Sequence, residues 1–208
     1  MAFSLLNNTL IHNRSTAFRL FTIGFISILG QVVLLRELNV AFYGIELMYT
    51  LAIGIWLIFS GIGTLIGLRK ENPSSIHTGI LFLLLSAVLP AGIGFTRAVR
   101  ILFFGTPGAY LPLHIQIFAT ASVLFPLGLL LGISFRWTAR SYIRRGESLT
   151  TAYAVESLGG IVGGLVATLF LKFGIQNLTA GLICALTAVA AALPTAGEPG
   201  RRALRIPI

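Results

Sequence analysis

Residues 47–68 read LMYTLAIGIWLIFSGIGTLIGL, and this stretch decides the class of fold because no charged residue interrupts it. In the hydrocarbon core of a bilayer every backbone polar group has to be hydrogen-bonded within its own segment, so a span of about 20 apolar residues adopts a helix. The stretch is long enough, and it ends at two basic residues, Arg69 and Lys70. It therefore predicts a helix that crosses a membrane.

Five further apolar stretches follow the same pattern, so we predict an all-α fold, a polytopic transmembrane bundle of about six helices. The predicted spans are residues 20–42, 47–68, 76–95, 111–135, 152–171 and 175–193. They place residues 1–195 in one membrane domain and leave residues 196–208 as a short cytoplasmic basic tail. The composition supports this prediction, since 56% of the residues are hydrophobic and 10% are charged, against about 25% charged in an average soluble domain.

Lys and Arg residues are distributed unevenly between the two sides of this predicted bundle. The N-terminal tail, the second and fourth loops and the C-terminal tail carry eleven of the fifteen. The other side carries Arg36, Arg97, Arg100 and Lys172. Because positively charged loops are retained in the cytoplasm, both termini are expected there, and we expect a bacterial cytoplasmic (inner) membrane. Residues 97–110 are predicted to be either an interfacial stretch on the bilayer or a plain connecting loop.

In the stretch QVVLLRELNVAFYGIEL, residues 31–47, the side chains of Gln31, Arg36, Glu37 and Glu46 interrupt otherwise apolar sequence. A charge at membrane depth is costly, so it is expected to be paired and to face protein or water. Arg36 paired with Glu37 or Glu46 is therefore a candidate functional site. The alternative is a salt bridge or a snorkelling arginine that only holds the hairpin at the interface.

A second unusual stretch, AYAVESLGGIVGGLVATLF, covers residues 152–170 and combines Glu156 with paired glycines. Small residues four apart let membrane helices approach closely, so these glycines and those of two other spans predict helix packing. The predicted packing positions are Gly61, Gly63, Gly67, Gly128, Gly132, Gly159, Gly160, Gly163 and Gly164. We expect Glu156 either to contact arginines of the fourth loop or to interact favourably, as a negative charge, with the N-terminus of its own helix. A catalytic or ion-coupling role is the alternative.

Groups able to carry catalysis are scarce in this chain. It contains no aspartate, and its three histidines, His12, His77 and His114, form no pair with metal-ligand spacing. The one cysteine, Cys184, lies in an apolar run with no nearby base. We therefore expect no metal site, no cofactor and no enzyme activity of the chain on its own.

The hairpin and the glycine stretch together resemble the membrane domain of spermidine-synthase-like integral membrane proteins. The resemblance is carried by Gln31, Leu35, Arg36, Glu37, Tyr43, Gly44, Glu46, Leu47, Tyr153, Glu156, Gly159 and Gly160. In longer relatives this domain is joined to a soluble synthase-like domain that binds decarboxylated S-adenosylmethionine, or a similar nucleoside, and a polyamine. The sequence after residue 193 has no glycine-rich turn of that kind, so the resemblance implies a membrane module without synthase activity.

Three functions are compatible with these features. The first is a non-catalytic membrane subunit or scaffold that assembles with other proteins in a hetero-oligomeric complex, and it is the one we expect. The second is a small-solute or polyamine translocation unit, suggested by glutamates and an arginine near the bilayer. The third is the membrane half of a split aminopropyltransferase-like system. Basic residues scattered between apolar runs indicate contact with the lipid bilayer and no nucleic-acid partner.

Overall fold

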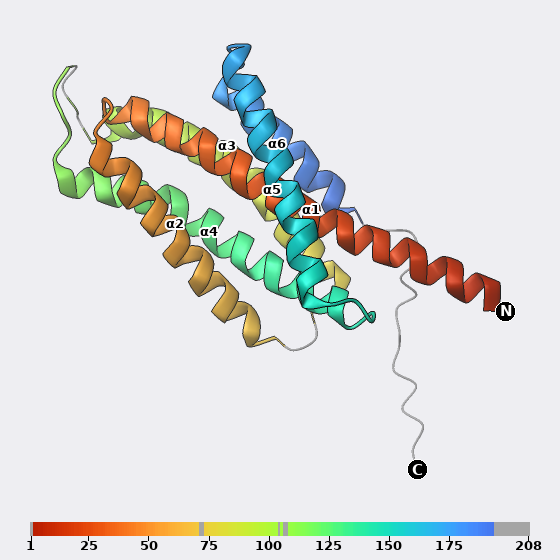
Figure 1. The fold of residues 1–208 in the computed structure, drawn as a ribbon. Coiled ribbons are helices and arrows are strands. Elements are labelled where there is room, and N and C mark those ends of the chain that lie inside the picture. Colours follow the sequence, from red (N-terminus) through yellow and green to blue (C-terminus); the bar gives the residue numbers. More distant parts are fainter. Residues whose placement is uncertain (1, 71–72, 104, 106–107, 194–208) are drawn as a thin grey trace.

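The computed structural model describes residues 2–70, 73–103, 105 and 108–193, with side chains described from residue 14 onward. These residues form six helices and no strand, which confirms the predicted all-α fold (Figure 1). The helices are α1 Ala2–Ala41, α2 Glu46–Leu68, α3 Ser75–Leu102, α4 Leu113–Ile143, α5 Leu149–Lys172 and α6 Asn177–Ala192. The predicted basic tail, residues 196–208, lies outside the described residues.

Five of the six helices, α1 to α5, are long and apolar enough to cross a bilayer. Helix α6 is also apolar, but its 16 residues make it shorter than the others. Successive helices run in opposite directions (Figure 1). One end of the bundle therefore holds the C-terminal ends of α1, α3 and α5 and the N-terminal ends of α2, α4 and α6.

Several helices extend beyond the predicted spans. Helix α1 already begins at Ala2, α3 continues to Leu102, and α4 continues to Ile143. Hydropathy reports where apolar residues stop, whereas a helix continues until a turn ends it, as at Gly146 and Gly174, which have φ values of 91° and 66°. Residues 97–102 are therefore helical, which excludes a plain connecting loop over them, and the first part of the predicted fourth loop is helical too.

The helices associate mainly as the pairs α1–α5, α2–α4 and α3–α6. In the first pair, a Cβ added at Gly159 would collide with the carbonyl oxygen of Phe21, and one at Gly163 would lie 2.7 Å from that of Phe25. In the second pair, a Cβ at Gly132 would collide with the backbone of Ser60. Glycine at these positions lets the two backbones touch, which is how helices pack in a membrane.

The other glycines predicted to pack differ in what they face. A Cβ added at Gly63 would collide with the backbone of Leu129, and added Cβ atoms at four more positions would meet another helix within 3.0–3.7 Å. Those four are Gly67 against Arg136, Gly128 against Phe59, and Gly160 and Gly164 against Ile28. At Gly61 a Cβ would meet nothing within 4 Å, so this glycine contacts no other helix among the described residues.

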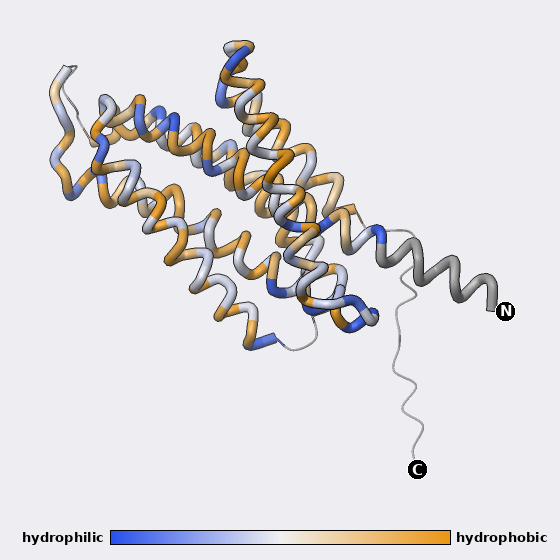
Figure 2. The backbone as a smooth tube through the Cα atoms, viewed as in Figure 1, coloured by the Kyte–Doolittle hydropathy of each residue, from blue (hydrophilic) through white to orange (hydrophobic). Residues whose placement is uncertain are grey.

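The outer surface of the bundle is covered with apolar side chains. Leu57 and Leu65 on α2 are 64% and 63% exposed, and Ile161 on α5 is 60% exposed. Hydrophilic residues gather mainly near the helix ends, while apolar residues dominate between them (Figure 2). A contiguous exposed apolar surface of this extent is unfavourable in water and favourable in lipid.

Candidate functional site

At the end of the bundle where α1 and α3 end and α6 begins, a buried carboxylate joins three helices. Glu37 is only 7% exposed. Arg97 of α3 donates two hydrogen bonds to the carboxylate of Glu37, from Nε to Oε2 at 3.0 Å and from Nη2 to Oε1 at 2.8 Å. Asn177 of α6 donates a third to Oε1 of Glu37 at 2.9 Å. A guanidinium that binds both carboxylate oxygens is the strongest of the common ion-pair geometries. We call Glu37, Arg97 and Asn177 the ionic triad.

The ionic triad corrects the predicted pairing of Glu37 with Arg36. Adjacent residues point in different directions from a helix, and the structure shows no hydrogen bond or ion pair of the Arg36 side chain among the described residues. Glu46 is exposed in the first turn of α2, and Gln31 is partly buried on α1. The hairpin residues predicted to form one polar cluster are therefore not brought together by hydrogen bonds. The sequence did carry a signal for the true pair, since Arg97 was predicted on the same side of the membrane as Glu37.

Arg100 stabilises the same end of the bundle. It donates to the carbonyl oxygens of Ala41 at 3.3 Å and Ala109 at 2.8 Å, and its guanidinium lies 4.2 Å from the centre of the Tyr43 ring. The Tyr43 hydroxyl accepts a hydrogen bond from the Gly108 amide at 3.1 Å. Together with the ionic triad, these contacts give Glu37, Arg97 and Arg100 internal partners, so these three residues stabilise the packing of the helices at this end of the bundle.

A cavity of about 290 Å³ lies between α1, α2, α4 and α5 and contains the second predicted site residue, Glu156. The residues that line it are Ile23, Ser27, Trp56, Leu57, Ser60, Thr64, Leu131, Gly132, Phe135, Tyr153 and Glu156. Glu156 is partly buried, and within the described part of the chain its carboxylate makes no hydrogen bond or ion pair. The expected contact of Glu156 with arginines of the fourth loop is therefore not formed.

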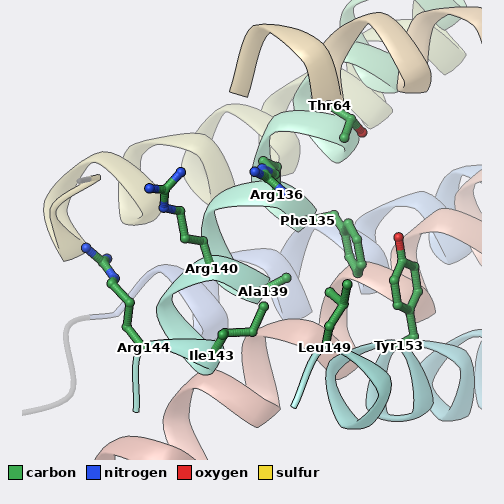
Figure 3. A pocket seen from close by; sticks show the side chains of 9 residues that line it. All are labelled: Thr64, Phe135, Arg136, Ala139, Arg140, Ile143, Arg144, Leu149 and Tyr153. Atoms are coloured by element: carbon green, nitrogen blue, oxygen red, sulfur yellow. The ribbon is translucent and has the colours of Figure 1, made fainter. Parts of the chain in front are cut away.

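Three of those arginines line a second cavity of about 270 Å³ at the end of α4 (Figure 3). Arg136 and Arg140 lie on α4 and Arg144 is the residue that follows its last turn, and Phe135 and Tyr153 lie on the other side of the cavity (Figure 3). Thr64, Phe135 and Tyr153 line both cavities. The two cavities therefore adjoin, and we call them together the α2–α5 groove, with Glu156 in its inner part and the arginines in its outer part.

The groove offers one carboxylate, three guanidinium groups and several hydroxyl groups for binding a ligand. Among the residues that the structure describes, no three His, Cys, Asp or Glu side chains gather as metal ligands would. Sequence analysis had singled out Glu156 but not Trp56, Ser60 or Thr64, which come from α2. Nothing in the sequence signalled that α2 would face α5 across a cavity.

The apolar helices and their exposed apolar faces define a multi-pass integral membrane protein. No family model, curated protein or solved structure matches the chain.

Proposed function

We propose that this chain binds a small organic cation, such as an amine, in the inner part of the α2–α5 groove and moves it across the bacterial cytoplasmic membrane. The observation that carries the proposal is the carboxylate of Glu156, which faces a cavity without a partner among the described residues. An ionisable side chain in a membrane helix is costly, and it is retained most often where a ligand or ion pairs with it.

The lining of the cavity suits an ammonium group. Trp56 and Tyr153 contribute aromatic rings, which attract cations through their π faces. Ser27 and Ser60 contribute hydroxyl oxygens that can accept hydrogen bonds from N–H groups. The contrast with Glu37 supports the assignment, because Glu37 already has Arg97 and Asn177 as partners whereas Glu156 has a cavity.

The position of the cavity suits transport. It lies between two closely packed helix pairs, α1–α5 and α2–α4, and α2 makes few contacts outside its own pair. In many transporters the substrate lies between two groups of helices that rock against each other, which exposes it to each side in turn. With both termini in the cytoplasm, the arginine-lined part of the groove would open toward the cytoplasm.

The test is uptake of radiolabelled spermidine and of a simple diamine into vesicles reconstituted with the purified protein. Glu156→Gln keeps the size of the side chain and removes its charge, so uptake is expected to fall by about tenfold or more, as for loss of a charged hydrogen-bonding partner. Glu46→Gln, which changes an exposed glutamate of α2, is the control and should leave uptake unchanged. Equal uptake by wild type and Glu156→Gln, or no uptake of either amine, would refute the proposal.

A scaffold that assembles with partner proteins is the second candidate, and α2 supplies the observation that favours it. Added Cβ atoms at Gly54 and Gly61 would meet nothing within 4 Å, and seven residues apart they share one helix face. Small residues on a membrane helix allow another helix to approach. A partner with transferase chemistry, as in the split system suggested by the sequence, is one form of this candidate.

The scaffold candidate predicts that other proteins copurify with the chain from native membranes. Gly61→Leu would fill the open face and should release them, whereas the exposed change Ile62→Leu should not. Identical protein content in the wild-type and Gly61→Leu preparations, measured by mass spectrometry, would count against it.

A further inference from the structure

Three arginines at the C-terminal end of α4 are not explained by the proposed amine site. Arg136, Arg140 and Arg144 are spaced by four residues, which places them along the same side of the helix, and all three line the outer cavity of the groove (Figure 3). Like charges at this spacing repel one another. A site that gathers them around one cavity therefore favours an anion in it.

The described residues supply no such anion for two of the three. Neither Arg136 nor Arg140 forms an ion pair with a carboxylate there, and the Nε of Arg136 is buried without a hydrogen-bond partner. Both side chains are partly buried rather than extended into water. Arg69, at the same end of the bundle, is by contrast exposed and lines neither cavity. An arginine that served only to orient the protein in the membrane would resemble Arg69.

Helix α2 holds Arg136 in place. The Cβ and Cγ atoms of Arg136 lie 3.1 Å from the position that a Cβ on Gly67 would take, so glycine leaves room for the arginine stem. The indole Nε1 of the next residue, Trp137, donates to the carbonyl oxygen of Gly67 at 3.1 Å. This bond and the contact at Gly67 fix how α4 lies against α2, so the stem of Arg136 starts from a fixed position beside the cavity.

The remaining wall of the outer cavity is mostly apolar and continues onto the surface that faces lipid. Phe135, Ile143 and Leu149 line the cavity, and Ile143 and Leu149 are 40% and 48% exposed. A ligand that fits both walls has an anionic head and an apolar tail. The cavity, at about 270 Å³, is close to the lower end of ligand pockets, which measure roughly 300–1,000 Å³.

From these features we infer that the outer cavity binds the headgroup of an anionic phospholipid. The phosphate is bound by Arg136 and Arg140, with Arg144 nearest the end of the helix, and an acyl chain lies along Ile143 and Leu149. Guanidinium groups bind phosphate oxygens in pairs of hydrogen bonds, and basic pockets between membrane helices recognise anionic lipid heads. A zwitterionic lipid fits less well, because its ammonium group would lie among the arginines. The site goes beyond the proposed function, because it requires neither Glu156 nor an amine.

The test is native mass spectrometry of the protein, purified in mild detergent and mixed with equal amounts of phosphatidylglycerol and phosphatidylcholine. Wild type should retain phosphatidylglycerol in preference to phosphatidylcholine. The double variant Arg136→Gln with Arg140→Gln should lower the retained phosphatidylglycerol by about tenfold or more, as for loss of charged hydrogen bonds to a phosphate. Arg69→Gln removes one charge from the same end of the protein and should not change it.

Three results would overturn the inference. One is equal retention of the two lipids by wild type, and another is an equal loss with Arg69→Gln, which would show that only total charge matters. The third is displacement of the lipid by inorganic phosphate in millimolar excess, because the site would then take a soluble anion. If the double variant does not elute as folded protein, the single variant Arg140→Lys takes its place in the test. Lysine keeps the charge but lacks the planar guanidinium, so this variant should still retain less phosphatidylglycerol than wild type.

Discussion

The ionic triad at the end of α1 allows a quantitative test of the structure. Glu37→Gln keeps the shape of the side chain but removes the charge that Arg97 binds at 2.8 and 3.0 Å. Oε1 of the carboxylate accepts hydrogen bonds from both Arg97 and Asn177, at 2.8 and 2.9 Å. An amide NH₂ group in its place is itself a donor and cannot accept either bond. The change therefore weakens the contact of α1 with both α3 and α6.

The expected magnitude follows from how buried each partner is. Removing one partner of a fully buried ion pair costs about 3–5 kcal/mol. The side chain of Glu37 is 9% exposed but that of Arg97 is 48% exposed, so water or lipid headgroups can solvate the guanidinium once its partner is gone. We therefore expect Glu37→Gln to lower the free energy of unfolding by about 2 kcal/mol, between the values for exposed and buried pairs.

The assay is reversible unfolding in mixed detergent micelles, followed by the helical circular dichroism signal. Glu46→Gln is the matched control, because Glu46 is exposed, and its effect should stay within about 0.5 kcal/mol. A double-mutant cycle with Arg97→Gln should give a coupling energy of about 1–2 kcal/mol, since the two side chains are in direct contact. If Glu37→Gln costs no more than Glu46→Gln, or if the cycle shows no coupling, the ionic triad does not exist as described.

Two further predictions concern helix packing. Gly159→Leu would drive a side chain into the Phe21 carbonyl where α1 and α5 touch, so the yield of monodisperse protein on size-exclusion chromatography should fall sharply. Gly164→Ala is the control and should have little effect, because its added Cβ would be 3.7 Å from its nearest neighbour. Equal yields of the two variants would contradict the close approach of α1 and α5. Trp137→Phe removes the indole donor to the Gly67 carbonyl and should lower the free energy of unfolding by about 1 kcal/mol in the same micelle assay, whereas unchanged stability would argue against that bond.

Helix α2 shows what can be predicted from the sequence alone. Its apolar stretch was expected at residues 47–68, and the helix runs from Glu46 to Leu68. The prediction succeeded here because charged or turn-forming residues flank the stretch closely on both sides, so the apolar run and the helix end together. Helix α1 begins well before its apolar stretch and α4 continues past the end of its own, in both cases through polar residues, so hydropathy could not show the start of α1 or the end of α4.

The candidate site was less accessible to sequence reasoning, because its contacts join residues far apart in the chain. Glu37 could be recognised as a charge that needed a partner, but its neighbour Arg36 was the nearest candidate, and the true partner, Arg97, lies sixty residues away. Glycines such as Gly159 mark a helix face that another helix will approach, yet they do not say which helix. The cavity around Glu156 depends on that choice of partners, so it appears only in the folded bundle.

The order in which the helices pair has a consequence for the synthesis of the protein and its insertion into the membrane. The partner of Glu37 lies on α3 and the main packing partner of α1 is α5, so neither has been synthesised when α1 leaves the ribosome. During that interval the nascent α1 holds an unmatched carboxylate. Glu37 lies four residues before the end of its helix at Ala41, where headgroups and water can solvate the charge until Arg97 arrives. Insertion of α3 then supplies Arg97 and completes the ion pair, while the third member of the ionic triad, Asn177, follows only with α6.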